Sequence, residues 1–272
     1  MANIGIIYMA TSIYKEYFYK FLNSFNKLFP EDNKTLIIIS DGLQEYDNKQ
    51  YDNFKIIVKN IVDLPYPIIT ACKLRYLTEF IKDYDFDYIL YFDADTIILE
   101  KPIEFWDYLK SKLDTQKLIV SLHPHYLYTP DRDFGEPFII SNPESVGYTD
   151  KKYVNANRSY IITSFFAGVP SIIKYIDDKL YTMLGEDLSK FRWMPLYPDE
   201  AYLNSIYVKE NIINNFNNID VDRYITINPY IYCDTDRNTC NIYENNFPEI
   251  NTIFINQKYN LAIKDNKKNN KV

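Results

Sequence analysis

Apolar residues along the first half of the chain follow two alternating patterns. Short continuous runs of aliphatic and aromatic residues alternate with longer stretches in which apolar residues recur every three or four positions. Short runs are typical of strands covered on both faces, and the longer stretches are typical of amphipathic helices. The runs predict strands at residues 4–9, 36–39, 54–58, 87–92 and 118–122.

Two helices are predicted between these strands. Ser12 is expected to cap the first helix, whose apolar positions are Tyr14, Phe18, Phe21, Leu22, Phe25, Leu28 and Phe29. The second has its apolar stripe at Leu74, Leu77, Phe80 and Ile81, which leaves Lys73, Arg75 and Glu79 on its other faces. The alternation of strand and helix predicts an α/β fold with an open, mostly parallel sheet flanked by helices.

The composition is that of a globular protein. The chain has 272 residues, of which 47% are hydrophobic and 17% aromatic, so it can build a sizeable core. We expect a single catalytic domain over residues 1–265 and a disordered polar tail at 266–272. The net charge of −7 argues against nucleic acid as a partner, because phosphate binding relies on clustered Lys and Arg.

Cysteine usage and apolar run lengths bear on the compartment. The three cysteines form no C-x-x-C pair and no even set, so a reducing compartment is the simpler inference. The first residues, MANIGIIYMATS, lack the basic start and long apolar core of a signal peptide. Since no run is long enough for a membrane span, we expect a cytoplasmic location and no membrane span.

The stretch YILYFDADTIILEKP, residues 88–102, contains the first candidate chemistry. Asp93 and Asp95 follow a predicted buried strand and flank Ala94, so in extended geometry both carboxylates point to the same side. Converging carboxylates repel each other unless a cation or a proton lies between them, and oxygen ligands suit Mg²⁺ or Mn²⁺. The alternative is a strand-to-turn junction in which one Asp caps the turn and the other is solvated.

The position of this D-x-D pair favours a functional interpretation. Ligands of open α/β sheets bind beyond the carboxyl ends of strands, and the pair follows such an end. The chain contains neither G-x-G-x-x-G nor G-x-x-x-x-G-K-[ST], which excludes a dinucleotide fingerprint and a P-loop. A D-x-D pair on a nucleotide-type sheet points to a nucleotide-sugar glycosyltransferase.

Four further segments extend this interpretation. YPDEAYLNSIY (197–207) resembles the W-H-D-E-S-H-L-N segment of the glycosyltransferase family that contains the histo-blood group A and B transferases and α-1,3-galactosyltransferase. SLHPHYLY (121–128) resembles the L-H-P segment of that family, and YIITSFFAGVP (160–170) resembles its Y-Y-L-G-G-F-F-G-G segment. QKYNLAIK (257–264) matches P-K-N-H-Q-A-V-R in spacing. The order and spacing of the segments agree with the family from Ile4 to Lys264.

The resemblance implies a GT-A fold and a metal-dependent transfer of Gal or GalNAc from a UDP-sugar to an acceptor glycan, with retention of configuration. Asp93 and Asp95 would bind Mn²⁺ (or Mg²⁺) and the diphosphate or ribose. Glu200 would face the sugar from the side opposite the departing UDP, as nucleophile or stabiliser, and Asp199 would bind donor hydroxyls. The other implied contacts are Met9, Ala10, Thr11 and Tyr14 at the uridine, Lys258 and Lys264 at the diphosphate, and His123 at the acceptor.

Departures from the family pattern bear on specificity. Ser164 lies where the family separates Gal from GalNAc donors, and because serine is larger than glycine, UDP-galactose is favoured. Lys73 falls where the family has an Arg near the diphosphate, with Arg75 as its rival. The lack of a membrane anchor would suit a bacterial or viral member.

Other interpretations remain open at the level of sequence. Asp199 and Glu200 also fit as first-turn acids after Pro198, and the two C-terminal lysines fit as a solvated basic tail. At the level of the whole protein, the alternatives are a metal-dependent nucleotide-sugar hydrolase or pyrophosphorylase, and a non-catalytic sugar-binding relative.

Overall fold

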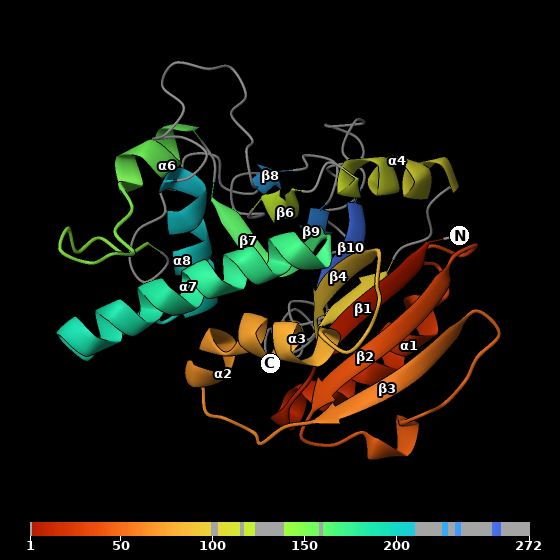
Figure 1. Cartoon of the computed structure of the whole chain (residues 1–272). Helices are drawn as coiled ribbons and strands as arrows, with labels where there is room; N and C mark the ends of the chain where they lie inside the picture. The colour runs from red at the N-terminus through yellow and green to blue at the C-terminus, as the bar shows by residue number, and fades with distance from the viewer. Residues whose placement is uncertain are drawn as a thin grey trace, which may run out of the picture.

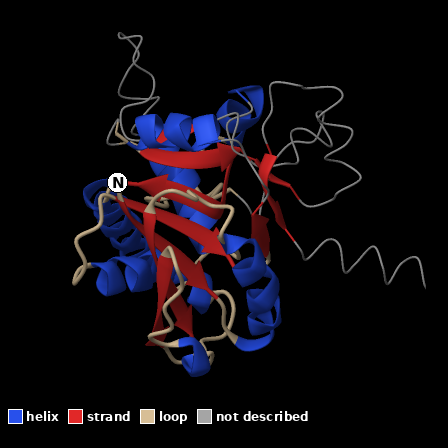
Figure 2. Cartoon of the chain, turned by 90° about the vertical axis from the view of Figure 1, so that its right-hand side faces the viewer, coloured by secondary structure: helices blue, strands red, loops and turns tan. Residues whose placement is uncertain are grey.

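The chain has an α/β fold in which helices cover both faces of a central mixed sheet (Figures 1 and 2). The structure, a computed structural model, describes residues 2–98, 103–114, 117–122, 139–157, 160–209, 225–227, 232–234 and 252–256. The α/β class predicted from the sequence is therefore confirmed. The expected tail at residues 266–272 lies outside the described residues.

The central sheet has the strand order β3-β2-β1-β4-β7-β6-β8. Strands β3, β2, β1 and β4 are parallel, whereas β7 is antiparallel to both β4 and β6. Among the described strands of this sheet only β7 runs in the opposite direction, so the sheet is mixed and, as predicted, mostly parallel. The strand bounds are Asn3–Met9 (β1), Asn33–Ser40 (β2), Phe54–Asn60 (β3), Tyr88–Asp93 (β4), Leu118–Leu122 (β6), Ile161–Gly168 (β7) and Ile225–Ile227 (β8).

Alternating side chains of the strands build a separate apolar core on each face of the sheet. Ile6 and Ile38 belong to the cluster covered by α1 and α4, and Ile7 and Ile37 to the cluster covered by α3, α7 and α8. The helix bounds are Phe18–Phe25 (α1), Ile68–Ala71 (α2), Lys73–Ile81 (α3), Ile103–Leu113 (α4), Lys151–Asn157 (α6), Pro170–Phe191 (α7) and Pro198–Tyr207 (α8), with short 3₁₀ turns at Ser12–Tyr17 (η1) and Gln44–Tyr46 (η2).

The predicted start of the first helix is wrong. Ser12 does not cap a helix: its φ is 52°, it begins η1, and its own amide donates to Asp41 Oδ1 at 3.2 Å. The carboxylate of Asp41 thus binds an N–H group at this turn, and the regular helix α1 starts only at Phe18. Leu28 and Phe29 lie beyond its end, yet both are fully buried, so their apolar character reflects core packing in a turn.

A second, three-stranded sheet has the order β5-β10-β9, with β5 at Thr96–Ile98, β9 at Tyr232–Asp234 and β10 at Thr252–Asn256. Strand β5 follows β4 after a turn of two residues, Ala94 and Asp95. It pairs antiparallel with β10, in a register that sets Asn256 opposite Thr96. A strand from near the end of the sequence is thereby placed next to the D-x-D turn.

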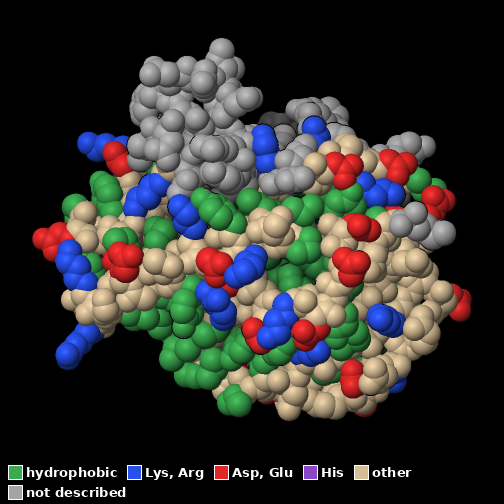
Figure 3. Space-filling model, viewed as in Figure 1, with side chains coloured by type: hydrophobic (Ala, Val, Ile, Leu, Met, Phe, Trp, Pro, Cys, Tyr) green, Lys and Arg blue, Asp and Glu red, His purple; other side chains and the backbone are tan. Residues whose placement is uncertain are grey.

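None of the described helices is long and apolar enough to cross a membrane. On the face of the molecule in Figure 3, Lys and Arg side chains are interspersed with Asp and Glu. That face carries no concentrated basic field of the kind that a nucleic-acid backbone requires.

Candidate functional site

A pocket of about 550 Å³ opens at the carboxyl ends of β1 and β4. Its described walls come from five segments that are distant in sequence, and its volume is in the range that accommodates small-molecule ligands. The position agrees with the rule for open α/β sheets, in which ligands bind beyond the carboxyl ends of strands. The segments are the end of β1 with η1, the stretch from the loop before α2 to the start of α3, the end of β4 with the D-x-D turn, the first half of β7 and the start of α8.

The D-x-D turn is held at this edge by two phenols. Asp93 ends β4 opposite Met9 of β1, and Tyr91 Oη donates to Asp93 Oδ1 at 2.6 Å. Tyr8 Oη donates to the carbonyl oxygen of Ala94, between the two acids, at 2.7 Å. Both Asp93 and Asp95 line the pocket, with Asp93 partly exposed and Asp95 buried. The sequence pattern therefore placed both acids at the correct sheet edge.

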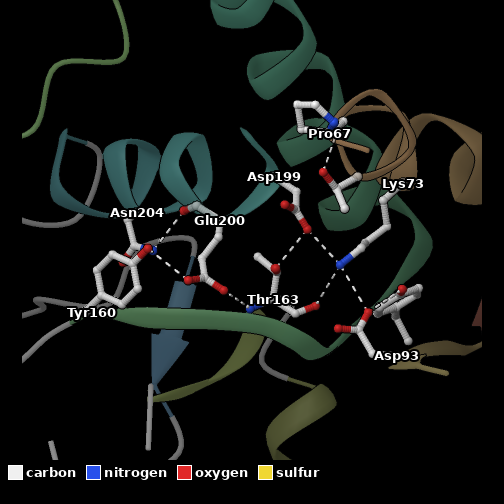
Figure 4. A network of polar contacts seen from close by, with 10 residues as sticks. Pro67, Lys73, Asp93, Tyr160, Thr163, Asp199, Glu200 and Asn204 are labelled. Atoms are coloured by element: carbon white, nitrogen blue, oxygen red, sulfur yellow. Dashed lines mark hydrogen bonds and ion pairs between the residues drawn. The ribbon is translucent and has the colours of Figure 1, made fainter. Parts of the chain in front are cut away.

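Lys73 lies buried at the centre of a polar network (Figure 4). Its Nζ is 2.7 Å from Asp199 Oδ2 and 3.1 Å from Asp93 Oδ1, and it donates to the carbonyl oxygen of Thr163 at 3.4 Å. Burial alone would lower the pKa of Lys73, but Asp199 and Asp93 outweigh burial and raise it well above its ordinary value. The ammonium group is thus charged at neutral pH and neutralises acids from α8 and β4.

Lys73 and Arg75, the two rival basic residues, lie in different surroundings. Arg75 faces α7, where its guanidinium group lies 3.3 Å from Asp177 and 3.5 Å from Asp178. Lys73 lines the pocket and Arg75 does not. The sequence had placed Lys73 on a polar face of α3; it is buried instead, because two carboxylates compensate for the loss of water around its charge.

Asp199 and Glu200 occupy the first turn of α8, which begins at Pro198 as predicted. Their side chains do not cap this helix but bind β7 and its flank. Asp199 Oδ2 accepts a hydrogen bond from Thr163 Oγ1 at 2.8 Å. Glu200 accepts from Tyr160 Oη at 2.9 Å and from the Thr163 amide at 3.3 Å. Asp199 and Glu200 are therefore first-turn acids by position, but their hydrogen-bond partners belong to β7 and its flank.

Burial is the main cause of the raised pKa of Glu200. The residue is 8% exposed, and burial followed by the charge of Asp199 raises the pKa of its carboxyl group to about 8. The hydrogen bonds from Tyr160 and Thr163, and the charge of Lys73, oppose this shift in part. Without a ligand, the group therefore carries a proton at neutral pH.

This shift predicts a measurable dependence of stability on pH. Between the ordinary pKa of 4.5 and the folded value of about 8, native Glu200 retains a proton that the unfolded chain releases. Its contribution to the free energy of unfolding must therefore fall as pH rises through that window, by up to a few kcal/mol. Urea titrations at pH 5 and pH 9 should show a smaller decline for Glu200→Gln than for the wild type; equal declines would contradict the raised pKa.

A break in strand register shapes β7 at the pocket. Val120 of β6 pairs with Phe166, but the next residue, Ser121, pairs with Ile162, so Thr163–Phe165 bulge from the ladder. The amide of Thr163 binds Glu200 and its carbonyl oxygen binds Lys73. Bulges next to functional sites commonly redirect backbone and side chains in this way. Thr163 and Tyr160 had no predicted role, although both lie in the quoted segment 160–170.

Ser164 follows in the bulge and lines the pocket. It is 3% exposed, and its Oγ has no hydrogen-bond partner among the described residues. Because a buried hydroxyl without a partner costs free energy, a polar ligand group at this position would be favoured.

Only some of the other predicted ligand contacts line the pocket. Met9, Thr11 and Tyr14 line the pocket. Ala10 is not among the lining residues. It is buried in the cluster covered by α1 and α4, and its amide donates to the Ile39 carbonyl oxygen. His123, Lys258 and Lys264 lie outside the described residues.

The donor set of the pocket fits a divalent cation that also binds a ligand. Within the described part of the chain, no three His, Cys, Asp or Glu residues are grouped to hold a metal by themselves. Asp93 and Asp95 supply two carboxylates, and Mg²⁺ commonly takes one or two carboxylates together with substrate phosphates. Among the described lining residues, Lys73 is the only Lys or Arg against several acids, so the pocket favours added positive charge.

The geometry of the pocket and the resemblance of the quoted segments carry the functional interpretation. No protein-family model matches the chain, and a search of curated proteins finds no significant match.

Proposed function

We propose that the chain is a retaining glycosyltransferase of the GT-A type that moves galactose, or GalNAc, from a UDP-sugar to a hydroxyl of an acceptor glycan, with Mn²⁺ or Mg²⁺. The observation that carries the proposal is the convergence of Lys73, Asp93, Asp95, Asp199 and Glu200 on one pocket at the carboxyl ends of β1 and β4. These residues come from α3, β4, the D-x-D turn and α8.

The surroundings of each group support the role that we propose for it. Asp93 and Asp95 would hold the metal, which neutralises charge on the departing diphosphate. Met9, Thr11 and Tyr14 would line the uridine. Asp199 is fixed through one oxygen by Lys73 and Thr163, which leaves its other oxygen for donor hydroxyls.

Glu200 is suited to stabilise the positive charge that develops during the reaction. A cation in the pocket lowers the pKa of a nearby buried carboxyl group, so the loaded site favours the ionised form. An ionised Glu200 can stabilise the positive charge that forms at the anomeric carbon as the bond to UDP breaks, as nucleophile or as electrostatic partner. Tyr160 and Thr163 fix its direction in advance.

The unpartnered hydroxyl of Ser164 supports a sugar as the ligand. A donor hydroxyl could satisfy Ser164 Oγ, whereas an acetamido group needs more volume than a hydroxyl. We expect Ser164→Gly to increase use of UDP-GalNAc relative to UDP-galactose by about tenfold, the scale of small volume changes in a pocket. Ser164→Ala is the matched control, since it removes the hydroxyl and keeps most of the volume. An unchanged donor ratio in Ser164→Gly would exclude this residue from donor selection.

The metal assignment predicts the effect of Asp95→Asn. A neutral amide is a poorer ligand for a hard cation, so UDP binding that depends on Mn²⁺ should weaken by about tenfold or more. Calorimetry of UDP with and without Mn²⁺ measures this. Metal-independent binding in the wild type, or unchanged binding in the variant, would contradict the assignment.

The release of UDP from UDP-galactose, UDP-GalNAc and UDP-glucose, with and without a panel of acceptor sugars, tests the proposed function. A transferase should release UDP faster with one acceptor and form a glycoside. A nucleotide-sugar hydrolase would ignore the acceptor, and a non-catalytic sugar-binding relative would release none.

A further inference from the structure

The carboxamide of Asn204 joins α8 to β7 close to Glu200 (Figure 4). Asn204 Oδ1 accepts from the Ile161 amide at 2.7 Å, and Nδ2 donates to the Ile161 carbonyl oxygen at 2.9 Å. Nδ2 also donates to the carbonyl oxygen of Glu200 at 2.8 Å. One side chain thus pairs with both backbone groups of a strand residue, as a neighbouring strand would, and also holds the residue that carries the reactive carboxyl group.

This contact lies next to the break in register between β7 and β6. Ile161 and Ile162 still pair with β6, and the register breaks immediately after them. Thr163 is the first residue of the bulge. Its amide donates a hydrogen bond to Glu200, and its carbonyl oxygen accepts one from Lys73. A bulged strand is locally freer to bend than a regular one, so an anchor at Ile161 decides where the Thr163 peptide points.

We propose that Asn204 is a positioning residue of this site: by locking Ile161 to α8, it holds the β7 bulge where Thr163 and Tyr160 grip the Glu200 carboxyl group. Its catalytic consequence rests on the proposed role of Glu200. The side chain is 1% exposed, and asparagine is the smallest side chain that offers one acceptor and two donors in this geometry. Aspartate lacks the donors and leucine lacks all three groups.

A purely structural role for Asn204 would lower stability and leave the Glu200 titration unchanged. A positioning role predicts a shift, because the Thr163 amide is one of the groups that lower the pKa of Glu200. The other groups that act on Glu200 are Asp199 on α8, Lys73 on α3 and Tyr160 before β7. None of them changes in the variants below.

The test compares Asn204→Leu and Asn204→Ala with the matched control Ser205→Ala. Ser205 is the next residue of α8 and is fully buried, and within the described part of the chain its Oγ has no hydrogen-bond partner. The Glu200 titration is followed by ¹³C NMR of the labelled carboxyl group in the full chain, without ligand. We expect both Asn204 variants to raise the midpoint by about half a unit or more, and Ser205→Ala to leave it unchanged.

Kinetics and hydrogen exchange complete the test. With the acceptor identified, kcat of the Asn204 variants should fall by about tenfold or more while KM for the UDP-sugar stays within about threefold. In the wild type, the Ile161 and Thr163 amides should exchange as slowly as those of α8, a measurement that needs no variant. Rapid exchange of these amides, or a Glu200 midpoint equal to that of Ser205→Ala, would overturn the proposal. Because both readings are made without substrate, they remain valid if transfer itself is not detected.

Discussion

Replacement of Glu200 by Gln is expected to reduce transfer by about two orders of magnitude or more, the scale observed when one electrostatic catalytic group is lost. The amide keeps the shape of the side chain but removes its charge. Because the interaction would strengthen only as the bond to UDP breaks, the loss should appear in kcat and not in binding. UDP and donor affinities should stay within a few-fold of the wild type.

Kinetics and calorimetry on the same preparation decide this prediction, with Asp199→Asn for comparison. Asp199 would hold donor hydroxyls in both the ground and transition states, so its variant should weaken donor binding as well as turnover. NMR of the product gives its anomeric configuration, and an inverted product would remove the retaining assignment. A normal kcat for Glu200→Gln would contradict the prediction and would leave Glu200 only as a first-turn acid of α8.

Loss of Lys73 is expected to have the largest effect on stability. Lys73→Met leaves the buried Asp199 carboxylate without its cation, and removal of one partner from a buried ion pair typically costs about 3–5 kcal/mol. Urea unfolding should show this loss at pH 7.

Two comparisons separate this effect from an ordinary loss of contacts. Lys110→Met removes a cation that pairs with Asp32 at 3.0 Å but is more exposed, so it should cost about 1 kcal/mol or less. The double variant Lys73→Met with Asp199→Asn should recover part of the stability, because the uncompensated charge is gone. A loss for Lys73→Met no larger than that for Lys110→Met would contradict the buried network.

The strands that the sequence predicted well are those with strong local signals. The runs at residues 4–9 and 118–122 became β1 and β6, because continuous β-branched and aliphatic runs suit a buried strand wherever it lies in the sheet. The position of Asp93 at a strand end followed from the same run. The start of α1 was missed, because the Asp41 carboxylate that binds the Ser12 amide belongs to another part of the chain.

The features of the site that escaped prediction depend on partners remote in sequence. The sequence around Lys73 contains no sign that its ammonium group will be buried and paired with Asp93 and Asp199. The bulge at Thr163 exists only relative to β6, and the role of Asn204 exists only relative to Ile161. Residue types therefore identified candidate acids, whereas the way they are held required the tertiary structure.

The order of strands in the central sheet sets when the pocket can form during synthesis. Strands β3, β2, β1 and β4 are neighbours and are complete once residue 93 is made, whereas β7, which covers the free edge of β4, comes much later. At about 5–20 residues per second, the roughly 75 residues from Asp93 to Gly168, the end of β7, take on the order of 4–15 s to emerge. Throughout that interval β4 is an unprotected edge strand, which is a template for aggregation. The nascent chain therefore most needs chaperone protection between the completion of β4 and the completion of β7.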